Sequence, residues 1–128
     1  MGLDNYILMC LPDDRVNDKI PMCYAHLQNE DGTYELCYWR RCYRIRNNIL
    51  ELCETYYSDF GYATKEIPKE RVGDLIKILK FYRHRKQWND YSTFYEWDYA
   101  KKMLRRQIHR LKMLRKVKDY RLIFIDSY

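Results

Sequence analysis

Apolar residues follow strand-like spacing near both ends of the chain. Residues 5–11 form an almost continuous apolar run that Pro12, Asp13 and Asp14 end, which predicts a buried strand. Residues 121–126 have the same character, and we expect a central strand there because so apolar a segment is unfavourable in water. Residues 21–28 and 33–38 flank an Asp31-Gly32 pair, which predicts a hairpin.

Helix-like spacing fills most of the remaining chain. Apolar residues recur every three or four positions from Trp39, which predicts a helix to about Tyr57, although the preceding strand could instead run on through residues 42–46. Residues 58–62 then form a loop. Pro68 suits the first turn of a second helix, whose apolar face is Val72, Leu75, Ile76, Leu79 and Tyr82. Residues 87–93 break the pattern, and Asp90, Ser92 or Thr93 can cap a third helix from about Phe94 to Lys118.

These elements predict an α+β fold, with a small mixed or antiparallel sheet of three to four strands packed against three helices. The third helix is long, basic and amphipathic. The chain has 128 residues, close to the usual size of one domain, and shows no repeat or linker. We therefore expect residues 1–128 to form a single domain.

The third predicted helix has one apolar side and one cationic side. Eight of the sixteen residues from Lys101 to Lys116 are Lys or Arg, and none is acidic. Like charges four residues apart on a helix repel by roughly 0.2–0.5 kcal/mol per pair, so an anionic partner would relieve a real cost. The partner could be nucleic acid or a nucleoprotein, or it could be an acidic protein surface. The third possibility is that the cationic side has no partner and is covered only by water.

The net charge is +6, and it is unevenly distributed. The first 64 residues carry 6 Lys or Arg against 10 Asp or Glu, whereas the last 64 carry 18 against 8. The C-terminal half therefore holds the positive surface, as is typical of a chain with an anionic partner.

Two further clusters combine aromatic residues with charge. Residues 37–46, CYWRRCYRIR, suit single-stranded nucleic acid because aromatic rings stack on bases while Arg contacts phosphates. The alternative is that Trp39 and Tyr43 are core residues and the Arg side chains are solvated or paired with Glu51 and Glu54. Residues 88–99, WNDYSTFYEWDY, are the second of these clusters. Their tyrosines either contact another protein or pack in the core around the start of the third helix.

Catalytic and metal-binding patterns are weak. The chain has five Cys and no CxxC. Cys23, His26, Cys37 and Cys42 could form a zinc site across the hairpin, but Cys23 and His26 would point to opposite faces of a regular strand, and buried free thiols are the commoner case. Asp13, Asp14, Asp18 and Lys19 lack the spacing of a nuclease site. No Gly-rich phosphate loop or nucleophile motif occurs. No secretion signal or membrane-spanning run is present, which favours a reducing, cytoplasmic setting.

We therefore expect a non-enzymatic intracellular protein, without cofactor, whose basic C-terminal half contacts nucleic acid or a nucleoprotein. The candidate binding residues are Lys101, Lys102, Arg105, Arg106, Arg110, Lys112, Arg83, Arg85, Lys86, Arg40, Arg41 and Arg44. Charge reversal at Arg105 and Arg106 should flatten the salt dependence of binding.

Two other classes of function remain open. In general composition the chain is similar to accessory proteins of phages and mobile elements. It could be a protein-interaction module that inhibits a larger, acidic-surfaced host enzyme or defence complex, as anti-CRISPR proteins do, with Tyr91, Tyr95 and Tyr99 as contacts. A small metal-dependent enzyme is the second alternative. The apolar edge of the third helix could equally form a homodimer, and no membrane contact is expected.

Overall fold

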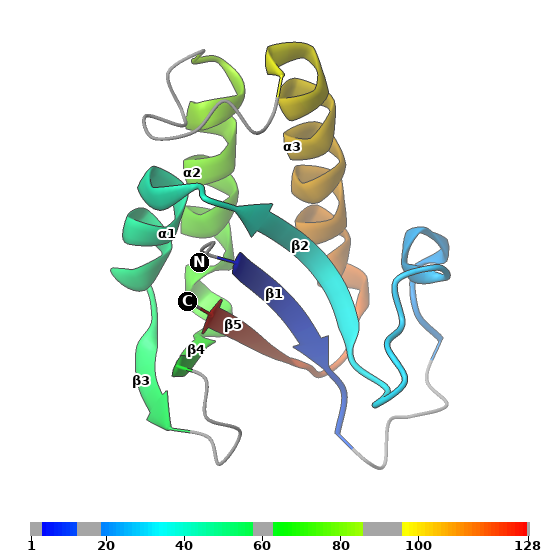
Figure 1. Ribbon diagram of the computed structural model, residues 1–128. Coiled ribbons are helices and arrows are strands. Elements are labelled where there is room, and N and C mark those ends of the chain that lie inside the picture. Colours follow the sequence, from blue (N-terminus) through cyan, green and yellow to red (C-terminus); the bar gives the residue numbers. More distant parts are fainter. Residues whose placement is uncertain (1–3, 13–18, 58–62, 86–95, 128) are drawn as a thin grey trace.

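The computed structural model describes residues 4–12, 19–57, 63–85 and 96–127. In these ranges five strands form one antiparallel sheet in the order β2-β1-β5-β4-β3. The strands are β1 (Asp4–Cys10), β2 (Tyr34–Arg40), β3 (Glu54–Tyr57), β4 (Ala63–Ile67) and β5 (Arg121–Ser127). Helices α1 (Tyr43–Leu50), α2 (Val72–Arg83) and α3 (Trp97–Lys112) lie on one face of the sheet (Figure 1). This arrangement confirms the predicted α+β class, with one strand more than expected.

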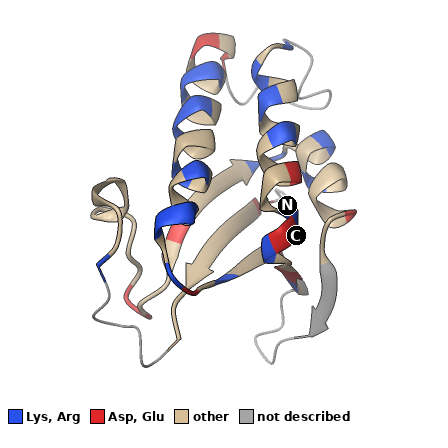
Figure 2. Cartoon of the chain, turned by 180° about the vertical axis from the view of Figure 1, so that it is seen from behind, with Lys and Arg blue, Asp and Glu red and all other residues tan. Residues whose placement is uncertain are grey.

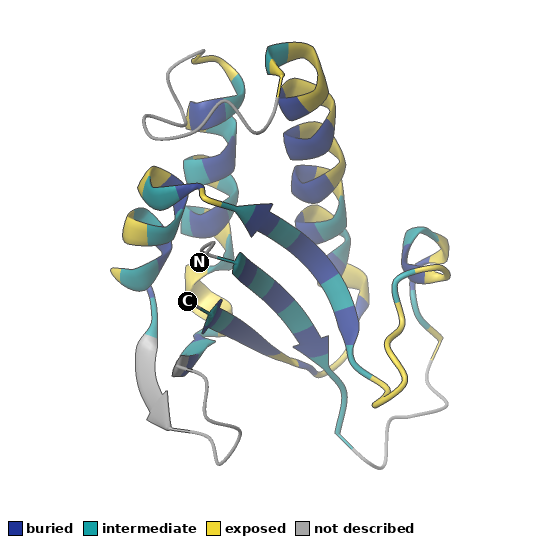
Figure 3. Cartoon of the chain, viewed as in Figure 1, coloured by how far each residue is buried: buried dark blue, intermediate teal, exposed yellow. Residues whose placement is uncertain are grey.

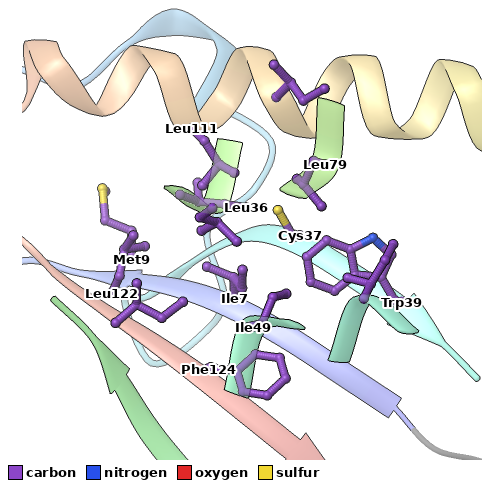
Figure 4. Packing of buried hydrophobic residues seen from close by; sticks show 14 of the residues in the cluster. Ile7, Met9, Leu36, Cys37, Trp39, Ile49, Leu79, Leu111, Leu122 and Phe124 are labelled. Carbon is purple, nitrogen blue, oxygen red and sulfur yellow. The ribbon is translucent and has the colours of Figure 1, made fainter. Parts of the chain in front are cut away.

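The core lies between the sheet and the helices. Ile7 and Met9 of β1 and Leu122 and Phe124 of β5 alternate with less buried residues, so every second side chain of each strand points toward the helices. Figure 4 shows this packing, in which side chains from β1, β2 and β5 meet side chains from the helices, and Figure 3 shows the same alternation of burial along β1. β5 pairs with β1 and β4 at the centre of the sheet, as its apolar sequence predicts.

The predicted hairpin is only half present. The turn forms, since Gly32 has a φ of 91° and the Asp31 carboxylate accepts hydrogen bonds from the backbone and hydroxyl of Thr33. The segment before it is not a strand, because Met22–Tyr24 is a 3-10 helix and a single bridge joins Gln28 to Tyr34. Instead of pairing, this segment packs on α3, where the buried Tyr24 hydroxyl donates to the backbone carbonyl of Arg110.

The helix predicted over residues 39–57 is wrong at both ends. β2 continues through Arg40, so Trp39 is buried as a strand residue, and α1 covers only Tyr43–Leu50. Residues 54–57 form β3, which pairs with β4 at the sheet edge. β3 and β4 are short, and neither has the apolar alternation that reveals a strand in sequence.

Helices α2 and α3 follow the predicted periodicity. Leu75, Leu79 and Tyr82 are the buried residues of α2, and Pro68 precedes the short 3-10 turn that leads into it. The buried side of α3 includes Ala100, Leu104, Ile108 and Leu111, and a 3-10 turn at Met113–Lys116 extends the helix. Phe94 and the three predicted caps lie outside the described residues. No helix within the described ranges combines the length and the apolarity needed to cross a membrane.

A buried ion pair joins α1 to the sheet. The Arg46 guanidinium donates to both carboxylate oxygens of Asp126, at 2.7 to 3.0 Å, and Asn5 donates to the same carboxylate at 2.9 Å. Asp126 is on the helix-facing side of β5 and only 4% exposed. Arg46 therefore serves the fold through its pair with Asp126.

Candidate anion-binding surface

The outward sides of α2 and α3 each carry a row of Lys and Arg side chains. Figure 2 shows Lys and Arg along both helices, on the side of the molecule opposite to the view of Figure 1. The two helices pack against each other, so cations from both meet where the helices adjoin. We call this set the basic seam, and it consists of Lys80, Arg83, Lys101, Lys102, Arg105 and Lys112.

A cavity of about 390 Å³ lies at one end of the basic seam. It is lined by Arg83 of α2, by His84 directly after it, and by Asp98, Lys101, Lys102 and Arg105 of α3. Asp98 is the one carboxylate among these lining residues, and it lies 3.5 Å from the ammonium of Lys101. Four cations therefore share one anion, which leaves a positive potential that suits a phosphate group.

At the other end of the basic seam, Lys112 meets like charge from α2. Repulsion from the Lys80 ammonium lowers the pKa of Lys112 below its ordinary value of 10.5, and Arg83 contributes in the same direction. The proximity of Lys80 and Arg83 to Lys112 means that the fold holds cations together against their repulsion. A bound anion would relieve that repulsion.

Replacement of Lys112 by Met should stabilise the free protein at neutral pH and low salt. Charged Lys112 opposes folding below its lowered pKa, and this penalty disappears as the pH rises toward 10.5. The gain in Tm over the wild type, followed by circular dichroism, should therefore shrink at high pH and at high salt. Lys118→Met, at an exposed position outside the basic seam, is the matched control and should leave Tm unchanged. A lower Tm for Lys112→Met would contradict this account.

Two predicted cations of α3 lie on its other flank, toward β2. Arg110 is half-buried and donates to the backbone carbonyl of Leu36 at 3.1 Å, and the neighbouring Gln107 donates to that of Tyr38 at 3.3 Å. These bonds satisfy carbonyl groups of an edge strand, which would otherwise be open to pairing with another chain. Arg106 lines a cavity of about 290 Å³ on this flank. The candidates on α3 therefore divide between two surfaces.

The other predicted site residues are dispersed. Arg40 is half-buried at the end of β2, Arg41 is exposed with a φ of 57°, and Arg44 is exposed on α1. Arg85 follows α2, and its guanidinium stacks 4.0 Å from the ring centroid of Phe81. The basic-aromatic cluster of residues 37–46 thus does not form one surface. Lys86, Tyr91 and Tyr95 lie outside the described residues.

The thiols of Cys37, Cys42 and Cys53 are poorly suited to nucleophilic chemistry. Burial raises the pKa of Cys37 well above its usual range, that of Cys42 to about 12 and that of Cys53 to about 11. A protonated thiol is a weak nucleophile. Across the described ranges no three His, Cys, Asp or Glu side chains gather as metal ligands, and Cys37 is buried whereas His26 is exposed. Asp13, Asp14 and Asp18 lie outside those ranges.

Lys80, Phe81 and His84 are surface residues that were absent from the predicted site. Lys80 and Phe81 lie on α2 but outside its apolar face, and His84 directly follows the helix. In the sequence they can be recognised only as positions that do not fit the three- and four-residue spacing of the apolar residues. Comparison with family models, with curated proteins and with solved structures finds no match to this chain.

Proposed function

We propose that this chain is a non-enzymatic nucleic-acid-binding protein of the cytoplasm whose basic seam contacts the phosphate backbone. The observation that carries the proposal is the row of six cations from two helices, four of which line a cavity that contains a single exposed carboxylate. Phosphate contacts of this kind supply affinity and orientation without reading a sequence.

The dimensions of the basic seam suit a polymer better than one small anion. From Lys101 to Lys112 the helix advances about 16 Å at 1.5 Å per residue. A duplex presents one negative charge per about 1.7 Å of its axis, so several phosphates lie within reach of a surface of this length. A nucleic acid could therefore neutralise both ends of the basic seam at once.

Replacement of Arg105 by Gln tests this assignment. It should weaken binding to any sequence and reduce the slope of log affinity against log salt by about 0.9, because one phosphate contact is lost. The measurement is a fluorescence-anisotropy titration with a labelled duplex at several salt concentrations. Arg121→Gln is the control for net charge, because it removes one positive charge from the opposite face of the sheet, where Arg121 pairs with Glu66 at 2.7 Å. Equal slopes for Arg105→Gln and the wild type would reject the assignment, and equal losses in both variants would indicate only net charge.

A protein-interaction module, such as an inhibitor of a larger host enzyme or defence complex, is the second candidate function. The observation that favours it is Tyr99, which is 52% exposed and lines the cavity beside Arg106, Met103 and Tyr38. Tyr and Arg are the residues that most often anchor protein interfaces. Tyr99→Ala would then abolish binding to the partner protein, whereas it should leave nucleic-acid binding by the basic seam intact.

A further inference from the structure

A second cavity adjoins the basic seam on the other side of α2. It has a volume of about 610 Å³ and is lined by three residues of α1 and four at the end of α2, namely Arg44, Asn47, Asn48, Phe81, Tyr82, His84 and Arg85. We call it the α1–α2 cavity. His84 lines both this cavity and the cavity of the basic seam, so the two surfaces meet at the C-terminal end of α2.

Phe81 is the feature of the α1–α2 cavity that the fold does not explain. Its side chain is 50% exposed, although a phenylalanine ring is among the most favourable groups to bury. The Arg85 guanidinium lies 4.0 Å from its centroid, and Tyr82 meets it edge-on with centroids 5.1 Å apart. Exposed aromatic rings and guanidinium planes are the surfaces on which unpaired nucleobases stack.

The polar groups around Phe81 suit the rest of a nucleotide. None of the described lining residues carries a carboxylate, whereas Arg44, His84 and Arg85 bring nitrogen donors or positive charge. The side-chain oxygen Oδ1 of Asn47 accepts a hydrogen bond from the Arg46 guanidinium at 3.2 Å, which leaves the side-chain NH2 group of Asn47 to donate to a base edge. Asn48 is held in place by its own bonds to the Arg44 carbonyl and the Tyr82 hydroxyl.

We infer that the α1–α2 cavity binds one unpaired base and its phosphate, next to a strand held on the basic seam. This inference rests on the proposed function, and it narrows the expected ligand of the protein to nucleic acid that contains at least one unpaired nucleotide. A volume of about 610 Å³ is in the range of small-ligand sites. A base inside a duplex is stacked and paired, so it cannot enter such a site unless it leaves the helix.

The test compares a blunt-ended duplex with the same duplex carrying a short single-stranded overhang, by fluorescence anisotropy at constant salt. The wild type should bind the overhang form about tenfold more tightly, since stacking of one base is worth about that factor or more. Phe81→Ala should remove this preference and leave the affinity for the blunt duplex unchanged. Tyr99→Ala, which alters an equally exposed ring outside the cavity, should retain the preference.

The outcomes separate this inference from the proposed function. Equal affinity of the wild type for both duplexes, or an unchanged preference in Phe81→Ala, would overturn the inference and leave the proposed function standing. Absence of binding to either duplex at low salt would overturn both. A third outcome is that the wild type shows no preference for the overhang but binds an acidic, tyrosine-containing peptide that Phe81→Ala does not bind. This result would assign the cavity to a protein partner and overturn the inference.

Discussion

Replacement of Asp126 by Ala should lower the free energy of unfolding by about 3 kcal/mol, because it removes the buried carboxylate that the Arg46 guanidinium contacts. The carboxylate is almost completely buried and accepts bonds from Arg46 at 2.7 Å and from Asn5 at 2.9 Å. Its loss removes three hydrogen bonds from Arg46 and one from Asn5. Urea denaturation followed by circular dichroism measures the change.

The matched control for Asp126 is an ion pair of the same length at the surface. Lys69 and Asp119 lie 2.6 Å apart, but both side chains are about half exposed. Asp119→Ala should therefore cost less than about 1 kcal/mol, since water and salt screen the pair. Similar losses in the two variants would contradict the view that burial makes the Arg46–Asp126 pair important. A loss below about 1 kcal/mol for Asp126→Ala would contradict it as well.

Asp126 also illustrates what the sequence could not reveal. Arg46 belongs to a run of arginines and aromatic rings that suggested a nucleic-acid surface. In the fold its charge is neutralised from a strand 80 residues away. Trp39, in the same run, is buried, while its neighbour Tyr38 lies on the other side of β2 and donates to Asp4. Strand alternation divides such a run between two faces, and long-range pairing decides which charges remain at the surface.

The strongly periodic elements were predictable, and the short edge elements were not. β1, β5, α2 and α3 each bury a continuous apolar stripe, so local spacing alone identifies them. β3 and β4 depend on pairing with β5 and with each other, which no local pattern records. The three- and four-residue recurrence from Trp39 to Tyr57 arose by coincidence from a strand end, a two-turn helix and a second strand.

The candidate site was predictable only in part. The helical period separates the apolar side of α3 from its cationic side, and the structure retains that division. A helical wheel cannot show which cations face a neighbouring element. Arg105 lies in the basic seam, whereas Arg106 and Arg110 face β2. The contribution of Lys80 to the basic seam requires the packing of α2 against α3, which the sequence does not encode locally.

The second large expected effect is the decrease of nucleic-acid affinity with salt concentration. If all six cations of the basic seam contact phosphates, log affinity should fall with log salt with a slope of about −5 on a duplex. Between about 50 and about 200 mM salt the affinity should then decrease by a factor on the order of 10³. A protein partner held by apolar and hydrogen-bonded contacts would show a much weaker dependence.

The most direct test is therefore a fluorescence-anisotropy titration of the wild-type protein with labelled single- and double-stranded DNA and RNA at these two salt concentrations. The account predicts binding at the lower concentration that falls by about 10³ at the higher one. Absence of binding at the lower concentration, or binding that is insensitive to salt, would contradict the claim that the basic seam contacts phosphates.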